Sequence, residues 1–512
     1  MGLFVRIVGM LFAGILVLLV IAAWWLQDAN NLKPELQTLI AEQSGYTARF
    51  NGNLRWQLFP PLELQVEDLE LTQDEEHIRI SEMQLSMDLS AMWQDIDQWR
   101  VTQLQLTDTE RSEGESKTVI EALTLRDFRP GQPAAFTLSA EHLSEADAET
   151  PAEPFAAVLE GMLTYHPADG DRGQRIELTD TQVDTAMASG LCQADITEVK
   201  HPAAAAPPAR DEDLLPVDTL LSYDLSADCE LAALTMGSET FQQSRVNLTN
   251  VAGQTNVLLD VQDFLGGSLV ADIDIDATST PMAWTIVPDM QNVDSQRLLA
   301  WADQRLQWIA PLAFNSTIRM YGNSETELAN SVQAASEFDG GQGQLNIATI
   351  KQQLMRIALL IQQTDEVAQW PDVWNYEEFT GRWNVNGPVH DLKFAIDNMS
   401  VDANGEYNYL GDAMDMLLNI TVHEPPEDSP FEVNPLLQGT PIPVRCTGSS
   451  AEPQCRLEED AIQQLVARAL TQGDESGLRQ KLEEKIDEEV PEEYRDTARS
   501  LLDLLGRALE DN

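Results

Sequence analysis

An alternation of apolar and polar residues returns along most of this chain of 512 residues. Leu62, Leu64 and Val66 alternate with glutamate and glutamine, for example. Similar runs, separated by Gly, Asp, Asn and Ser, stand at 78–80, 83–89, 104–106, 136–138, 176–178, 223–225, 246–248, 259–261 and 270–275. A period of two places successive side chains on opposite faces of a strand. The pattern predicts a mainly β fold with a largely antiparallel sheet, one face of which is apolar.

An uncharged apolar run at 7–26 follows Arg6 and is long enough to cross a bilayer. Its length, at about 1.5 Å per residue, is roughly 30 Å. Cleaved signal peptides have shorter apolar regions, and the tryptophan pair at 24–25 is typical of an interfacial anchor. We expect an uncleaved transmembrane anchor at 1–27. Arg6 before the run and Asp28 after it predict a cytoplasmic N-terminus and a periplasmic bulk, on a bacterial inner membrane.

The charge of the chain limits its partners. With 31 Lys and Arg against 85 Asp and Glu, the formal net charge is 31 − 85 = −54. Such a surface repels phosphate backbones, so nucleic acid is excluded as a partner. The length also exceeds what one hydrophobic core organises. Composition and pattern predict an N-terminal β-region at 28–200, a Pro- and Ala-rich linker at 201–213, a second β-region at 214–456 and an acidic helical tail at 457–512.

Helical spacing of apolar residues appears in a few places. The segment 28–44 carries Leu32, Leu36, Leu39 and Ile40 on one face and ends at a glycine, which predicts an amphipathic helix near the membrane. Two helical inserts are expected in the second β-region, at 293–309 and at 347–361. The tail is open to two interpretations, a solvated amphipathic segment or a helix pair that binds a partner protein.

Four cysteines suggest an oxidising compartment. Cys446 and Cys455 enclose a short loop containing a proline, and Cys192 and Cys229 flank a loop-like stretch, so both pairs are disulfide candidates. The alternative is four free buried thiols.

The sequence offers little catalytic chemistry. Its six histidines are scattered without metal-ligand spacing, and neither a nucleophile elbow nor a phosphate-binding loop is present. Asp272, Asp274 and Asp276 alternate on what should be one solvated strand face. We therefore expect neither an enzyme, nor a metal site, nor a cofactor.

Ordered motifs from the N-terminus onward resemble the AsmA family of envelope proteins. They begin with the anchor and the amphipathic helix and continue with SGY at 44–46, GNLRW at 52–56, PPLEL at 60–64, LGGSL at 265–269, PDMQNVD at 288–294, FDGGQG at 338–343 and PIPV at 441–444. The resemblance covers about 1–455. The insert at 347–361 and the tail do not correspond to the family pattern.

The resemblance implies a role in outer-membrane biogenesis, through an elongated, curved sheet that forms a groove as in bridge-like lipid transfer proteins. Acyl chains of phospholipid would lie on the apolar face while headgroups stay in water. The alternation supplies groove candidates: Leu62, Leu64, Val66, Leu85, Met87, Leu104 and Leu106. Trp56 and Phe59 would mark the entrance.

Two alternatives remain open from the sequence. A closed β-sandwich core would produce the same alternation as an open groove. The runner-up function is a membrane-anchored scaffold that binds envelope assembly proteins through the tail without carrying lipid.

Overall fold

The computed structural model describes the residues 29–44, 46–57, 62–73, 76–88, 100–113, 116–144, 155–170, 172–200, 212–302, 306–348, 370–424, 438–450 and 453–457, with 210, 304, 351, 355 and 368 singly. The chain divides into two compact units. Unit 1 is formed by 1–206 with 218–253, and unit 2 by 207–217 with 254–512. The predicted anchor at 1–27 lies outside the described residues, and so does the tail after 457. None of the described helices is long and apolar enough to cross a membrane.

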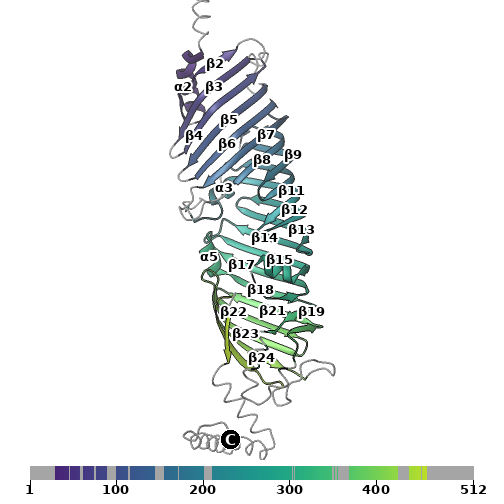
Figure 1. Ribbon diagram of the computed structural model, residues 1–512. Helices are drawn as coiled ribbons and strands as arrows, with labels where there is room; N and C mark the ends of the chain where they lie inside the picture. Colours follow the sequence, from purple (N-terminus) through teal and green to yellow (C-terminus); the bar gives the residue numbers. More distant parts are fainter. Residues whose placement is uncertain are drawn as a thin grey trace, which may run out of the picture. The chain divides into compact units, whose positions relative to one another are not determined.

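Unit 1 begins with short helices and continues as a sheet (Figure 1). Its elements are η1 (Ala29–Leu32), α2 (Lys33–Ser44), β1 (Thr47–Phe50), β2 (Leu54–Gln57), β3 (Leu62–Gln73), β4 (Glu76–Met87), β5 (Val101–Glu113), β6 (Ser116–Phe128), β7 (Pro133–Ser144), β8 (Phe155–His166), β9 (Arg175–Thr185), β10 (Ala188–Glu198), α3 (Val217–Ser222), β11 (Tyr223–Met236) and β12 (Glu239–Val251).

The sheet of unit 1 is an antiparallel meander. Each strand from β3 to β12 pairs with the next strand along the chain, and β1 and β2 pair with the two halves of β3. Among the described residues no pairing joins β12 to β1 or β2, so the strands of this unit do not close on themselves. The predicted antiparallel, mainly β fold is confirmed.

A line of backbone irregularities crosses the first long strands. Asp68 in β3 and Asp108 in β5 have positive φ angles of 47° and 48°. Opposite Asp68, at Ser81, the β3–β4 ladder is interrupted without losing register. The apolar residues of β3 therefore change from even to odd numbers, and Val66 and Leu69 still share one buried cluster. The irregularity also explains why β4 has two apolar runs in the sequence although it is one strand.

The predicted amphipathic helix at 28–44 is confirmed as η1 followed by α2. Leu32, Leu36 and Ile40 pack against the buried cluster of this unit, as their spacing predicted. That cluster, the α2 cluster, consists of Ala29, Ala48, Leu54, Val66, Leu69 and Ile80. Hydrogen bonds fix the helices to the sheet edge, since the Lys33 ammonium donates to the Gly52 carbonyl at 2.7 Å. The side chain of Leu39 lies outside what the structure describes.

Unit 2 contains a second antiparallel meander and a small additional sheet (Figure 1). Its elements are β13 (Gln254–Phe264), β14 (Gly267–Asp276), β15 (Ala283–Asp294), α4 (Ser295–Trp301), β16 (Trp308–Ile309), β17 (Pro311–Tyr321), α5 (Glu325–Ser331), β18 (Gln333–Asp339), β19 (Gly343–Asn346), β20 (Val373–Tyr376), β21 (Phe379–Asn386), β22 (Val389–Ile396), β23 (Met399–Asn408), β24 (Ala413–Val422), β25 (Ile442–Gly448) and β26 (Pro453–Leu457). The meander pairs β13, β14, β15, β17, β18, β21, β22, β23, β24, β25 and β26 in this order.

The small sheet β16–β19–β20 carries its own aromatic core. The Trp308 indole N–H donates to the Tyr376 hydroxyl at 2.6 Å. The ring of Phe379, in β21, lies 5.0 Å from Trp308 and 5.5 Å from Phe394, centroid to centroid. These contacts place the small sheet against one end of the apolar face of the meander.

The predicted helix at 293–309 is wrong beyond Trp301. Asp294 caps α4 by accepting from the backbone amides of residues 296 and 297, but the helix ends at Trp301, and Trp308 and Ile309 form a strand. The chain turns back because the Ser295 hydroxyl donates to the Trp308 carbonyl at 2.7 Å and accepts from the Ala310 amide at 2.8 Å. Most of the insert predicted at 347–361 lies outside the described residues.

Candidate functional site

Apolar side chains form continuous rows across the strands of unit 1. In the first row, Leu64 lies opposite Leu85, which lies opposite Leu104, and Leu125 and Phe136 continue the row on β6 and β7. The second row, two residues further along each strand, consists of Val66, Met83, Leu106, Leu123, Leu138, Leu159 and Val183. Antiparallel register thus joins alternating residues of consecutive strands into one apolar face.

These rows remain partly open. Val66 is 1% exposed and Phe136 is 6% exposed, whereas the other members of both rows keep intermediate exposure. A sandwich core would bury such leucines almost completely under a second layer of structure. Beyond the residues that pack against the α2 cluster, this exposure is that of an apolar face packed only by its lateral neighbours. It distinguishes this part of unit 1 from a closed core, which the sequence alone did not.

The α2 cluster covers the beginning of this face. Leu64 and Leu106 pack against the cluster, and so does Trp56. Leu85 and Leu104 do not belong to it and remain partly exposed. In the first row, Leu64 therefore packs against the α2 cluster, and the uncovered part of the row begins at Leu85.

The structure brings most of the predicted groove residues together. Met87 lies opposite Leu62 on one side and opposite Val101 on the other, next to the first row. The side chain of Leu62 lies outside what the structure describes, and Phe59 is not described at all. Whether these residues contact lipid, and whether Trp56 marks an entrance, stay predictions.

Sequence reasoning missed the continuation of the rows on β6, β8 and β9. The segment 119–125 contains Leu123 and Leu125, but its period of two is broken at Glu121, where the β6–β7 register shifts. Leu159 on β8 and Val183 on β9 likewise lie next to register shifts. These positions are revealed by the pairing between strands. The sequence of a single strand does not specify that pairing.

The opposite face of the same strands is polar. Gln65 donates to the Glu82 carboxylate at 2.7 Å, and Arg55 lies 3.4 Å from Glu67. Charge is also found on the other face, at the end of β4 beyond Ile78, where the Tyr46 hydroxyl and the Arg111 guanidinium donate to Glu76 and lower the pKa of its carboxyl. Along the two rows, the sheet therefore separates a charged, solvated face from an apolar one.

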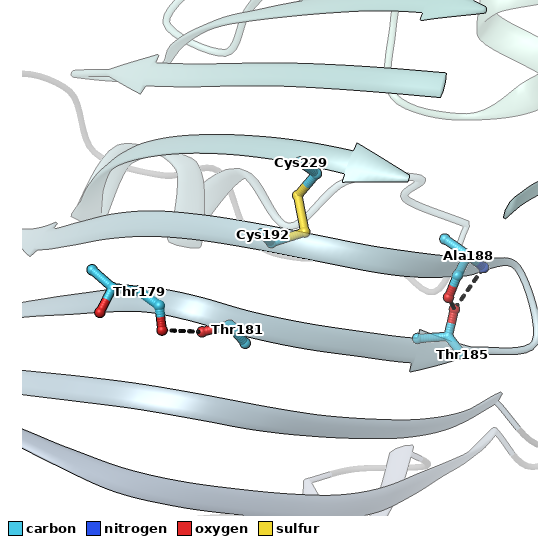
Figure 2. Close-up of a disulfide and its surroundings, with 6 residues drawn as sticks. All are labelled: Thr179, Thr181, Thr185, Ala188, Cys192 and Cys229. Carbon is cyan, nitrogen blue, oxygen red and sulfur yellow. Dashed lines mark hydrogen bonds between the residues drawn. A yellow bond between two sulfur atoms is a disulfide. The ribbon is translucent and has the colours of Figure 1, made fainter. Parts of the chain in front are cut away.

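Both predicted disulfides are present, and the alternative of four free thiols is wrong. Cys192 on β10 and Cys229 on β11 are directly opposed, with Cα atoms 4.1 Å apart (Figure 2). Thr181 on β9 lies opposite Cys192. Cys446 and Cys455 join β25 to β26 in the same way. Each disulfide connects neighbouring strands and therefore fixes their register.

The apolar face of unit 2 is more completely buried. Val401, Ala403 and Met416 are 3–8% exposed and pack with partly buried neighbours on β22 and β24. On the polar face, Asp272 and Asp274 are exposed as predicted, and the Asn256 amide donates to both at 2.6 and 2.9 Å. Asp276 is only partly exposed, and it accepts hydrogen bonds from the Thr278 and Ser279 hydroxyls. In the described part of the chain, no group of three or more His, Cys, Asp or Glu residues is placed to hold a metal ion.

Comparison with known proteins identifies a family at the N-terminal end. The model of the AsmA family matches residues 1–119. The resemblance to the AsmA family is confirmed over these residues. The AsmA match includes α2, the strands β1 to β5 and the groove candidates from Leu62 to Leu106. The AsmA-like motifs beyond residue 119 stay predictions. No curated protein and no solved structure matches the chain.

Proposed function

We propose that this protein is anchored in the inner membrane and carries phospholipid through the periplasm along the apolar face of its sheet, in outer-membrane biogenesis. The observation that supports this proposal is the pair of continuous, partly exposed apolar rows in unit 1. An acyl chain lying on them would remove apolar surface from water on both partners, at about 25 cal/mol per Å². The AsmA match at 1–119 fits an envelope protein.

The dimensions of the second row suit an acyl chain. The row crosses the seven strands β3 to β9, which at about 4.8 Å per strand spans about 29 Å. A hydrocarbon core of about 30 Å holds two acyl chains end to end, so one chain is about 15 Å long. Such a chain would cross three to four strands. The headgroup would stay in water at the margin of the face, while the acyl tails contact the apolar side chains.

Placing charge on the apolar face tests the proposal. We would replace Leu85 and Leu125, which lie two strands apart in the first row, in the double variant Leu85→Asp with Leu125→Asp. The matched control is Gln84→Asp with Thr124→Asp, which adds the same charges on the polar face of the same strands. The full chain is purified in maltoside detergent, and bound phospholipid is quantified by mass spectrometry.

We expect the wild type and the polar-face control to retain phospholipid and the apolar-face variant to lose most of it. Circular dichroism checks that all three proteins keep their strand content. Lipid-free wild type, or equal lipid content in both variants, would contradict the proposal. Deleting 458–512 addresses the scaffold alternative, because a lipid carrier keeps its lipid without the tail whereas a scaffold loses its partner proteins in pull-downs.

A further inference from the structure

An open cavity of about 510 Å³ lies on the polar face of unit 2, over the neighbouring strands β17, β18, β21, β22 and β23 (Figure 1). Cross-strand register places two rows of its lining residues on that face. One row consists of Asn315, Glu337, Arg382, Lys393 and Asp402, and the other of Ala313, Asp339, Thr380, Ala395 and Ser400. The rings of Phe338 and Phe394, between the two rows, point to the opposite face, where both contact Phe379. All the charged side chains of the cavity therefore share one face of the sheet.

Some polar groups of this cavity already have partners within the protein. The Lys393 ammonium lies 3.2 Å from the Asp402 carboxylate, so these two charges compensate each other. The Ser400 hydroxyl forms a hydrogen bond of 2.9 Å with Nε2 of His423. The cavity is therefore closed to further strong contacts on the side of β23.

Three exposed charges on β18 and β21 have no such compensation. In the part of the chain that the structure describes, no ion pair is made by Glu337, Asp339 or Arg382. Asp339 uses one carboxylate oxygen to accept from the Gly341 amide at 2.8 Å. Arg382 lies directly opposite Glu337 on the neighbouring strand. Asp339 lies two residues further along β18, at about 6.8 Å from Glu337 for an extended strand. One guanidinium and two carboxylates are thus left for a ligand.

We infer that this cavity binds a free diamino acid such as lysine. Its α-carboxylate would lie on Arg382, its α-ammonium on Glu337 and its side-chain ammonium on Asp339. A purely anionic ligand would meet two uncompensated carboxylates, and a purely cationic ligand would meet an uncompensated guanidinium. A diamino acid carries one negative and two positive charges and matches all three groups. The inference does not rest on lipid transport, because the cavity lies on the polar face.

The dimensions and the chemistry of the cavity agree with such a ligand. The two ammonium groups of an extended lysine are about 7 Å apart, which is close to the separation of the two carboxylates along β18. A guanidinium binds a carboxylate through two parallel hydrogen bonds, so Arg382 suits the α-carboxylate. A cavity of this volume suits a small molecule. A lysine within a protein chain lacks both free α-groups and would leave Arg382 uncompensated.

Isothermal titration calorimetry on the full chain in maltoside detergent tests the inference. The probe is lysine, and three analogues each lack part of its charge. Norleucine lacks the side-chain ammonium, cadaverine lacks the carboxylate, and Nα-acetyl-lysine amide lacks both α-charges, as does a lysine in a protein. We expect lysine to bind at least about tenfold more tightly than each analogue, because only lysine satisfies all three charged groups. Equal binding of lysine and any one analogue, or no binding of lysine up to about 10 mM, would overturn the inference.

Two variants assign the ends of the ligand. Asp339→Asn keeps the oxygen that accepts from the Gly341 amide but removes the charge, so we expect lysine to bind about five- to tenfold more weakly and norleucine to bind unchanged. Arg382→Gln should weaken lysine and norleucine alike and leave cadaverine unchanged. The matched controls are Glu406→Gln on β23 and Arg319→Gln on β17, which are exposed and do not line this cavity.

All four variants replace exposed side chains, and the urea midpoint of each checks that the protein remains folded. We expect both controls to leave the affinity for lysine unchanged. Unchanged lysine binding in either folded cavity variant would exclude the assigned site. An equal loss of lysine and norleucine binding in Asp339→Asn would overturn the placement of the side-chain ammonium, and with it the choice of a diamino acid.

Discussion

The open apolar face of unit 1 makes a quantitative prediction about two leucines. Leu54 is 2% exposed within the α2 cluster, whereas Leu85 is partly exposed on the uncovered part of the face. Truncation of a fully buried leucine to alanine costs about 2 to 5 kcal/mol, because transfer free energy is lost and a cavity remains. We expect Leu54→Ala to cost about 3 kcal/mol. Leu85→Ala should cost only about 1 kcal/mol, because Leu85 lacks neighbours on its outer side and leaves no closed cavity.

Hydrogen exchange resolves both changes in the full chain. The free energy of opening is measured by mass spectrometry for peptides of β2 to β5, in wild type and both variants, under identical detergent conditions. Gln84→Ala, on the polar face of β4, serves as the control and should change the opening free energy by less than about 0.5 kcal/mol. Equal losses of about 3 kcal/mol for both leucines would refute the reasoning. Leu85 would then lie in a closed core, and the proposed lipid-binding face would lose its structural basis.

Three further predictions concern bonds and titrating groups. Replacing Cys192 and Cys229 by serine should lower the free energy of unfolding by about 4 kcal/mol in the chain-entropy model, seen as a lower urea midpoint of the variant under non-reducing conditions. His390 on β22 is 3% exposed, and this burial lowers the pKa of its imidazole. Its contribution to stability is therefore complete above about pH 6.5 and declines as the pH falls below that value, so His390→Gln should flatten the pH dependence of the urea midpoint between pH 7.5 and 5. The pKa of Glu327, lowered to about 2 chiefly by hydrogen bonds from Arg210, should return toward 4.5 in Arg210→Gln, as carboxyl NMR titration will show; an unchanged pKa would contradict that cause.

The strands of the fold could be predicted because side-chain alternation is a local property of extended backbone. Leu64, Leu85 and Leu104 were placed on one face from their spacing alone, and the structure pairs them in one row. The row could not be followed onto β6, because the register shift at Glu121 breaks the period that a single strand displays. Continuity across strands depends on pairing between distant segments, which no local pattern specifies.

Helix lengths were predicted less well for a related reason. The apolar spacing after residue 293 favours a helix through Ile309, but hydrogen bonds of Ser295 with Trp308 and Ala310 return the chain to a strand. Tertiary hydrogen bonds thus override local periodicity. The amphipathic helix α2 was predicted correctly because Leu32, Leu36 and Ile40 face the sheet next to which the chain places them.

The aligned irregularities at Asp68, Ser81 and Asp108 restrict how this sheet can change during evolution. Removing one residue on one side of Asp68 would turn half of β3 over and place its leucines in water, while β4 kept its own phase. To keep all apolar side chains on one face, every neighbouring strand would have to lose one residue at the same time. Deleting or inserting a complete hairpin avoids this mismatch, because the apolar residues of each remaining strand stay on the same face. We therefore expect the length of the meander to vary among related chains in steps of two strands, with the phase of each surviving strand preserved.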